Sequence, residues 1–259
     1  MFVSILLSLV LSISISSPTG SLPAWGKTGH RITGKIAADH LNKEAKKEIR
    51  RILGHESIAI ASIWMDQIRS DPRYDYTHDW HWVTIPNGKT YEETEKNPNG
   101  DLIQALRRLI DELKQDKLSH TAEKRKLKMI IHLMGDLHQP LHVGTGNDRG
   151  GNDTNVEWFY EPSNLHRVWD SGMIDETKLS YTEFSRAINY ATGDEIKKWS
   201  QGTILDWAYE ARDLREEVYD LPKDRQLSYR YMYIHRPTLD LQLLKGGIRL
   251  AHVLNEIYG

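Results

Sequence analysis

The sequence predicts a mainly α-helical, single-domain protein with one small irregular or hairpin segment. Apolar residues recur every three or four positions along most of the chain, as they do on the buried face of a helix. Residues 143–163 differ, because they are rich in Gly, Asn and Asp and then alternate Val156, Trp158 and Tyr160. No internal repeat or linker divides the 259 residues, which suffice to bury a sizeable core.

Residues 1–24 are expected to be a signal peptide. Residues 2–15 form an apolar run with interspersed serines, shorter than the ~20 residues that span a bilayer. Pro18, Gly20 and Pro23 follow, and cleavage is expected after Ala24. No Lys or Arg precedes the run, so an uncleaved membrane anchor is the alternative. The signal predicts a secreted or periplasmic protein without membrane attachment after cleavage.

The mature chain, residues 25–259, is expected to open with three helices. Apolar residues between 32 and 41 share one face of the first helix. Asn42 is a suitable N-cap for the second helix, and Gly54 is a suitable end for it. The third helix covers about 58–69 and stops before Pro72.

The rest of the chain is predicted to alternate one long irregular stretch with further helices. Residues 71–99 are expected to be mostly irregular or extended, and an aromatic patch at 229–233 precedes the last helix. The remaining helices are expected at 101–115, about 121–139, and about 164–172, 180–192, 194–218 and 237–257.

The central helix ends in a cluster of potential metal ligands. His132 and Asp136 are four residues apart and therefore share one helical face, which is a natural half-site for zinc. Pro140 cannot continue the helix, so His142 can approach a site from another direction. A surface ion pair is the alternative for a single His/Asp pair.

The same spacing occurs again in His166 and Asp170, which makes a chance pair less credible. Eight candidate ligands are too many for one ion and enough for two or three. Each also has an ordinary structural alternative, such as core packing for His81 or an Asp66–Arg69 ion pair. The candidates are His30, Asp66, His81, His132, Asp136, His142, His166 and Asp170.

Composition restricts the chemistry further. The chain has no cysteine, which excludes disulfides and thiolate zinc sites. Its formal net charge is −2 and its pI about 6.6, unlike the basic surface of a duplex-DNA reader. Attraction of an anionic substrate would therefore need a local source such as bound metal.

Together these motifs resemble a known family, the secreted three-zinc single-strand-specific nucleases of fungi and plants (S-one/P-one type), with bacterial relatives. The shared order and approximate spacing cover His30, Trp64-Met-Asp66, Trp80-His81, His132 to His142, Gly150-Gly-Asn152 and Asn164 to Asp170, and Gly246 to Asn255 resembles the last helix of the family. The resemblance implies a nearly all-α fold, like that of the distantly related zinc-dependent phospholipases C.

The resemblance also implies three zinc ions per chain. One is held by Asp66, His81, His132 and Asp136; a second by His30, a bridging Asp136 and the free amine and carbonyl of Trp25; and a third by His142, His166 and Asp170. Before signal cleavage the Trp25 nitrogen is an amide, so processing is expected to complete the second site. His138 matches no ligand and is expected beside the site or at the surface.

The implied reaction is hydrolysis of single-stranded DNA and RNA to 5′-phosphorylated products, with 3′-nucleotidase activity, by a monomeric enzyme. Asp66 is the implied catalytic residue, and Arg69 and Asn152 match positions that contact substrate. Trp82 is expected to stack on an unpaired base, with core packing as the alternative. Thr84 stands where the family often has an Asp for base recognition, so the family's base preference does not carry over.

Two other functions remain at this stage. A zinc-dependent phospholipase C shares the N-terminal Trp and the His-rich site, but the joined motifs from His132 to Asp170 favour the nuclease. A secreted zinc-binding protein without enzymatic activity is the other, and an assay for turnover separates it from both enzymes.

Overall fold

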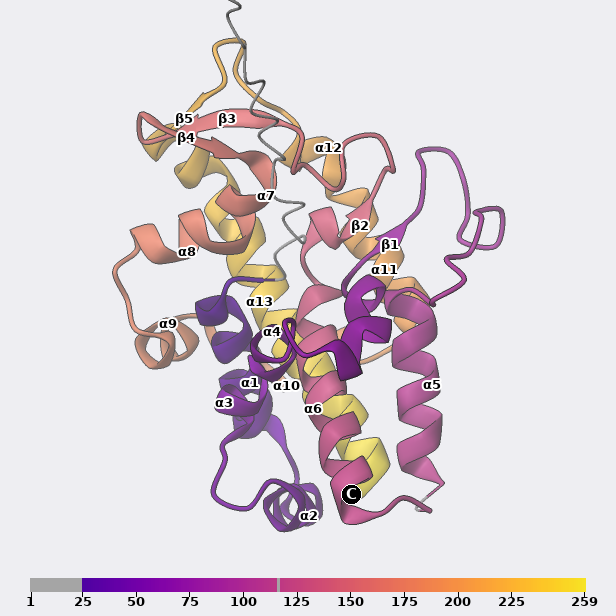
Figure 1. Cartoon of the computed structure of the whole chain (residues 1–259). Coiled ribbons are helices and arrows are strands. Elements are labelled where there is room, and N and C mark those ends of the chain that lie inside the picture. Colours follow the sequence, from indigo (N-terminus) through magenta and orange to yellow (C-terminus); the bar gives the residue numbers. More distant parts are fainter. Residues whose placement is uncertain (1–24, 116) are drawn as a thin grey trace, which may run out of the picture.

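The protein is mainly α-helical, as the sequence predicts, with two small sheets at one end (Figure 1). The structure is a computed structural model that describes residues 25–115 and 117–259, so the expected signal peptide at 1–24 lies outside the described residues. The helices are α1 Lys27–His40, α2 Lys43–Leu53, α3 Ile58–Ala61, α4 Trp64–Gln67, η1 Pro72–His81, α5 Leu102–Lys114, α6 His120–Asp136, η2 Pro140–His142, α7 Leu165–Arg167, η3 Val168–Gly172, α8 Met173–Glu176, α9 Tyr181–Ile188, α10 Gly193–Trp199, α11 Ile204–Asp213, α12 Arg215–Val218 and α13 Tyr229–Tyr258.

The larger sheet has the order β4-β3-β5. Strands β3 (Asn155–Trp158) and β4 (Glu161–Asn164) form an antiparallel hairpin, and β5 (Gln226–Leu227) pairs parallel to β3. The hairpin alternative for residues 143–163 is therefore confirmed. Tyr160, however, lies in the turn and not in a strand, with a positive φ of 70°.

The smaller sheet pairs β1 (Val83–Thr84) in parallel with β2 (Val143–Gly144). Strand β1 follows the predicted ligand His81, and β2 follows the predicted ligand His142. Pairing of the two strands therefore brings these two histidines close together. Arg215 of α12 fixes the arrangement from behind: its guanidinium donates to the carbonyls of Ile85 and Val143, at 2.9 and 2.7 Å.

Helix α13 is the longest element and runs beside α1 and α6 through the body of the molecule (Figure 1). The buried apolar side chains form two clusters. One includes α5, α6 and the C-terminal half of α13, and the other includes α8, α9 and its N-terminal half. Helix α1 contributes to both clusters, with Ala37 in the first and Ile32 and Ile36 in the second.

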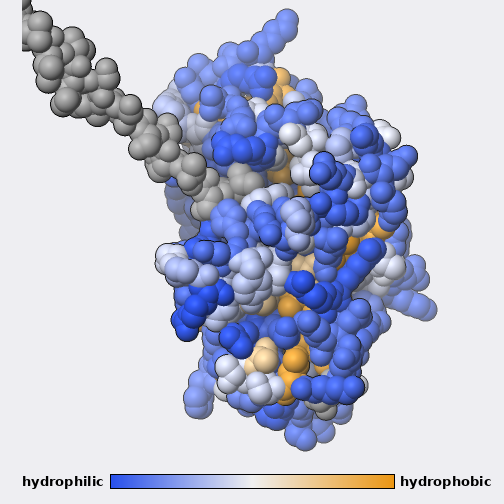
Figure 2. Space-filling model, turned by 45° about the vertical axis from the view of Figure 1, so that its right-hand side comes forward, coloured by the Kyte–Doolittle hydropathy of each residue, from blue (hydrophilic) through white to orange (hydrophobic). Residues whose placement is uncertain are grey.

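No helix in residues 25–115 or 117–259 is long and apolar enough to cross a membrane. Figure 2 shows a face that is mostly hydrophilic, with apolar side chains visible only in small separate patches.

The predicted helix at 58–69 is wrong as a single element, because the chain breaks it at residues 62–63. The Ser62 hydroxyl bonds back to the Ala59 carbonyl at 2.8 Å, a local bond that competes with helix continuation. The break leaves the Ser62 carbonyl without a helical partner, and it accepts a bond from His132 instead, at 2.6 Å. The interruption therefore serves a predicted ligand.

The predicted irregular stretch at 71–99 contains a ten-residue 3₁₀-helix, η1. Asp71 caps it by accepting from the Arg73 amide at 3.1 Å, and Pro72 occupies its first turn. The prediction failed because the polar and aromatic residues of η1 lack the apolar period of an α-helix.

Two further helix boundaries differ from the prediction. The segment 194–218 is three helices, since Gly202 has a φ of 93° and Thr203 begins a new capping box with Asp206. The last helix begins at Tyr229 and passes through Pro237, because Tyr231 is buried and its hydroxyl donates to the Val218 carbonyl at 2.8 Å. The contact of Tyr231 with Val218 thus lets the helix begin eight residues before Pro237, although proline normally occupies the first turn of a helix.

The closest approach of α13 to α1 yields the first prediction. A Cβ added at Gly247 would lie 2.5 Å from the Ile36 Cβ, so Gly247→Ala should destabilise the protein by about 1–3 kcal/mol through overpacking. Gly193→Ala is the matched control, because nothing lies within 4 Å of its added Cβ; it should be neutral or stabilise by up to about 1 kcal/mol. Urea denaturation measures both, and equal midpoints for Gly247→Ala and the wild type would contradict tight packing here.

Candidate metal centre and the adjacent hollow

The structure brings all the predicted ligands together, most of them at or near the ends of helices. They are Trp25 and His30 at the start of α1, Asp66 in α4, His81 at the end of η1, His132 and Asp136 on α6, His142 in η2, His166 in α7 and Asp170 in η3. All except Asp66 are buried, and Asp66 is half-buried. Their convergence from segments far apart in sequence argues against the alternative of isolated surface pairs.

Asp136 lies at the middle of the centre and is fully buried. Its Oδ2 is 2.9 Å from His81 Nδ1 and 3.2 Å from His132 Nε2. Its Oδ1 is 3.4 Å from both His30 Nε2 and His142 Nδ1. Four imidazoles from four different elements therefore surround one carboxylate.

Backbone carbonyls fix the orientation of three of the histidine rings. Nδ1 bonds to a carbonyl in His132 (Ser62, 2.6 Å), in His142 (His81, 2.8 Å) and in His166 (Gly150, 2.6 Å). A carbonyl can only accept, so each Nδ1 must be the donor, and each neutral ring then presents the Nε2 lone pair. A backbone partner of this kind is typical of metal-binding histidines.

The group formed by His142, His166 and Asp170 shows why a cation fits. His166 Nε2 is 3.0 Å from Asp170 Oδ2, and His142 Nε2 is 3.6 Å from Asp170 Oδ1. His142 Nε2 and Asp170 Oδ2 are buried without a hydrogen bond. Acceptors that face one another in this way are unfavourable unless a cation lies between them. The π-helical turn η3, which carries Asp170, is a type of irregularity frequent at functional sites.

Trp25 and His30 complete the other side of Asp136. The Trp25 backbone nitrogen lies 3.3 Å from Asp136 Oδ1, and its indole donates to the Gly135 carbonyl at 2.7 Å. His30 stacks on His132 with ring centroids 3.8 Å apart, and both of its ring nitrogens are buried without a hydrogen bond. The indole bond thus holds the Trp25 nitrogen at the site.

The pKa shifts at the centre favour neutral His30 and His81 and an ionised Asp136, which are the protonation states that bind a metal ion. Burial lowers the pKa of His30, and lowers that of His81 to about 4, so both rings are neutral at pH 7. Burial raises the pKa of Asp136, but the charges of His132 and His142 outweigh it and hold the pKa well below its usual value. Burial lowers the pKa of His132, but Asp136 outweighs it and leaves the pKa raised. Asp136 thus attracts positive charge, which a divalent cation supplies as well as a proton does.

The donor spacing suits zinc. Ligands about 2.0–2.1 Å from one tetrahedral ion lie roughly 3.3 Å from each other, close to the separations around Asp136 and Asp170. Three groups have ligand atoms within 4.8 Å of one another: His30, Asp66 and His132; His81, His132 and Asp136; and His142, His166 and Asp170. An all-nitrogen and oxygen donor set is one that zinc accepts in catalytic sites.

Asp66 lies at the open side of the centre, with its carboxylate 3.7 Å from the Arg69 guanidinium. Both side chains are partly accessible, at 14% for Asp66 and 24% for Arg69. The predicted ion pair is therefore present, and it places a cation beside the metal-ligand cluster.

A hollow of about 220 Å³ adjoins the centre and has two ligands, His142 and His166, in its wall. Trp82 and Thr84 form another part of the wall, and Arg149 lies at the same hollow. Trp82 is half-buried, so its ring is neither a core residue nor fully exposed. The alternative of simple core packing for Trp82 does not hold.

The structure does not bring Asn152 into this wall. Its side chain donates to the Arg149 carbonyl at 3.0 Å, within its own turn. The neighbouring Gly150 supplies the carbonyl that orients His166, and a Cβ there would lie 2.3 Å from the Leu141 carbonyl oxygen. Residues 150–152 thus shape the site through backbone, while a substrate contact by Asn152 stays a prediction.

Sequence reasoning missed Gln139 and Gly135. Gln139 is fully buried; its amide donates to Asp170 Oδ1 at 2.7 Å and its carbonyl accepts from the Leu141 amide at 2.6 Å. No common capping pattern reveals it. Gly135 does carry a signal, because glycine inside a helix costs about 1 kcal/mol relative to alanine. A Cβ there would lie 2.8 Å from His30 Nδ1.

His138 is beneath the site and not at the surface. It is 1% exposed, and its Nδ1 bonds to the Met134 carbonyl at 2.8 Å. Its Nε2 is 3.1 Å from Arg249 of α13, which also donates to the Trp199 carbonyl. His138 therefore ties the end of α6 to α13.

Comparison with known proteins adds a family to this geometry. The S1/P1 nuclease family model matches residues 25–259, a range that contains every predicted ligand. Endonuclease 2 of Arabidopsis thaliana is 25% identical over 97% of this chain and 96% of its own length. Nuclease P1 of Penicillium citrinum is 28% identical over 91% and 98%. A solved structure, an alpha toxin from Clostridium absonum, matches with a TM-score of 0.49 and 15% identity over 92% of this chain and 67% of that one.

The role of Gln139 yields the second prediction. Gln139→Leu removes the donor to Asp170, so zinc affinity should fall roughly 10–100-fold, as for other residues that orient metal ligands. Gln242→Leu is the matched control, because Gln242 is equally buried on α13 and its side-chain oxygen has no partner. Zinc competition titration against a chromophoric chelator measures both. Unchanged affinity in Gln139→Leu would show that Asp170 does not need this bond.

Proposed function

Because the chain belongs to the S1/P1 nuclease family, we propose that it is a secreted zinc-dependent endonuclease. It hydrolyses single-stranded DNA and RNA to 5′-phosphorylated products and also acts as a 3′-nucleotidase. The observation that carries the proposal is the convergence of buried acceptor atoms around Asp136 and Asp170 inside the range that matches the family.

The centre holds three zinc ions in this proposal. Asp66, His81, His132 and Asp136 hold one, Trp25, His30 and Asp136 hold another, and His142, His166 and Asp170 hold the third. The short distances from Asp136 to His30, His81 and His132 support the bridging role. The 3.3 Å distance from the Trp25 nitrogen to Asp136 supports ligation by a free amine after signal cleavage.

Bound zinc supplies a Lewis acid for phosphate and lowers the pKa of a coordinated water to ~7. The chain's own residues orient the reactants. Asp66 faces the open side of the centre, where its carboxylate accepts a proton from the attacking water and directs that water at phosphorus. Arg69, 3.7 Å from Asp66, supplies a positive charge that attracts the phosphate.

The adjacent hollow explains the preference for single strands. A base in the hollow stacks on Trp82, which lies next to the ligand His81 in sequence. A paired base would first have to leave its helical stack, which costs a few kcal/mol. Thr84 in the wall offers a hydroxyl and no charge, so it accepts more than one base.

The third prediction concerns activity. The purified mature protein should contain close to three zinc ions per chain when its metal content is measured by elemental mass spectrometry. It should cleave single-stranded DNA and RNA at least roughly tenfold faster than duplex DNA, because of the unstacking cost. A chelator should abolish the cleavage, and added zinc should restore it.

Phosphatidylcholine is the contrasting substrate in the same assay. Release of phosphocholine without cleavage of nucleic acid would identify a phospholipase C and reject the nuclease. Zinc binding without turnover of either substrate would identify a zinc-binding protein without this activity. Full cleavage by metal-free protein would reject the role of zinc.

The fourth prediction compares two ligands. Asp136→Asn weakens two metal sites and removes the negative charge between them, whereas Asp170→Asn touches one. Asp136→Asn should therefore lose more than one zinc per chain and more activity than Asp170→Asn, which should lose at most one. Equal zinc loss in the two variants would contradict bridging by Asp136.

A further inference from the structure

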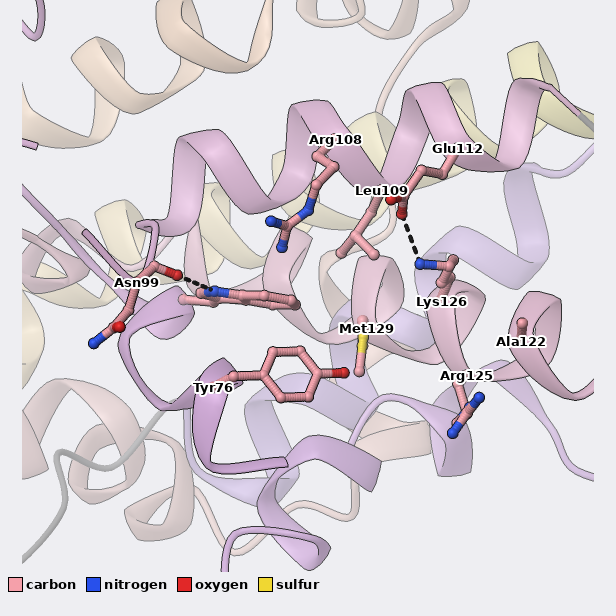
Figure 3. A pocket seen from close by; sticks show the side chains of 10 residues that line it. Tyr76, Asn99, Arg108, Leu109, Glu112, Ala122, Arg125, Lys126 and Met129 are labelled. Carbon is pink, nitrogen blue, oxygen red and sulfur yellow. Dashed lines mark hydrogen bonds and ion pairs between the residues drawn. The ribbon is translucent and has the colours of Figure 1, made fainter. Parts of the chain in front are cut away.

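A second hollow, of about 430 Å³, lies between η1, α5 and the N-terminal half of α6 (Figure 3). Its floor is apolar, because Trp80, Leu109 and Met129 are each buried to within 4% exposure. Tyr76 lies at its edge and is 53% exposed. The hollow combines a wide apolar floor with one accessible aromatic ring.

The aromatic part of the hollow is rigidly held. The Trp80 indole donates to the Asn99 carbonyl at 2.9 Å. The Arg108 guanidinium lies 4.5 Å from the centroid of the Trp80 ring. Tyr76 meets the Trp80 ring edge to face at 5.2 Å, which leaves the exposed Tyr76 ring available to another planar group. Figure 3 shows Tyr76 on the opposite side of the hollow from Arg108, whose guanidinium lies over the Trp80 ring.

The charged part of the hollow is positive. Glu112 is paired with Lys126 at 2.7 Å, so these two charges neutralise each other. Arg108 and Arg125 are both exposed, and neither has an acidic partner in residues 25–115 or 117–259. Figure 3 shows Arg125 at the α6 end of the hollow. Two available guanidinium groups therefore flank the apolar floor of an otherwise mildly acidic protein.

Helix η1 connects this hollow to the metal centre. His81, the last residue of η1, contacts Asp136, and Trp82 follows in the wall of the other hollow. Two separate ring pairs occur on this segment: Tyr76 contacts Trp80, and the partly exposed His78 contacts Trp82 at 5.7 Å, both edge to face. Tyr76 and Trp82 lie six residues apart on this segment, which is roughly 12 Å at about 2.0 Å per residue, so one strand can contact both.

We propose that the hollow formed by Tyr76, Trp80, Arg108 and Arg125 is an accessory site for one nucleotide of a single-stranded substrate. A base stacks on the exposed ring of Tyr76, and Arg108 and Arg125 supply positive charge for a phosphate of the same strand. The inference rests on the proposed nuclease function, which supplies the reason for a strand to pass along η1. Aromatic stacking beside arginine is the general mode of sequence-tolerant single-strand binding.

The chemistry favours a nucleotide over an acidic peptide. A peptide carboxylate would pair with Arg108 or Arg125 but has no use for the exposed Tyr76 ring. A nucleotide offers both a planar base and a phosphate, and arginine binds phosphate with two parallel hydrogen bonds. An accessory contact of this kind strengthens binding of long strands without acting on the scissile bond.

The test compares substrates of two lengths on the zinc-loaded enzyme. Tyr76→Ala and Arg125→Ala should raise KM for an oligothymidine of roughly twenty nucleotides about fivefold or more and leave kcat unchanged. Both variants should cleave a dinucleotide as the wild type does, because a dinucleotide cannot reach both sites. Arg125→Ala should also reduce the dependence of log affinity on log salt by about 0.7, the value of one phosphate contact.

Tyr190→Ala and Arg50→Ala are matched controls. Both original side chains are exposed, and they lie after α9 and on α2, elements that contribute no residue to the hollow. The two test variants and the two controls should all match the wild type in zinc content and thermal midpoint. This result excludes misfolding as the cause of weaker binding of the long strand.

Three results would overturn the inference or its basis. Wild-type kinetics on the long strand in both variants would overturn the accessory site, and so would an equal loss on both substrates, which points to distortion of η1. If the wild type cleaves neither substrate, the nuclease function is rejected. In that case, fluorescence anisotropy measures the affinity of the wild type and the variants for the same uncleaved strand. Equal affinities would overturn the accessory site.

Discussion

The buried carboxylate of Asp136 is the group on which the rest of this structure depends. An anion removed from water is costly unless opposite charge and hydrogen bonds surround it. Here the surroundings are imidazoles from four separate elements and the backbone nitrogen of Trp25. The helices are therefore arranged so that their ends and interruptions, rather than their apolar faces, meet at one point.

Those interruptions supply the backbone carbonyls that orient the histidines. The Ser62 carbonyl comes from the break between α3 and α4, the His81 carbonyl from the end of η1, and the Gly150 carbonyl from a turn with positive φ. A continuous helix would use such carbonyls in its own hydrogen bonds. The short, irregular helices around residues 58–81 are thus a requirement of the site.

The sequence was sufficient to predict the helical class and the His and Asp residues that the structure brings together. Pairs such as His132 and Asp136 are visible because four-residue spacing is a property of the helix alone. The breaks at Ser62 and in η1 were not predictable in this way, since they depend on partners distant in sequence. Gln139 was hidden for the same reason: its value lies in a bond to Asp170, which only the tertiary structure reveals. The pairing of Arg108 with Trp80, at the second hollow, is another contact of this kind.

The ligands extend from Trp25 to Asp170, and the chain has no cysteine. With zinc bound as proposed, the ions join distant segments as disulfides do in other proteins, but reversibly. A ligand that binds only the folded state stabilises it by about 2.7 kcal/mol when its free concentration is 100 times its dissociation constant. The stabilisation from these cross-links is therefore set by the concentration of free zinc. Scarcity of the metal would loosen the fold at the same time as it silences the site, leaving the unused protein open to proteolysis.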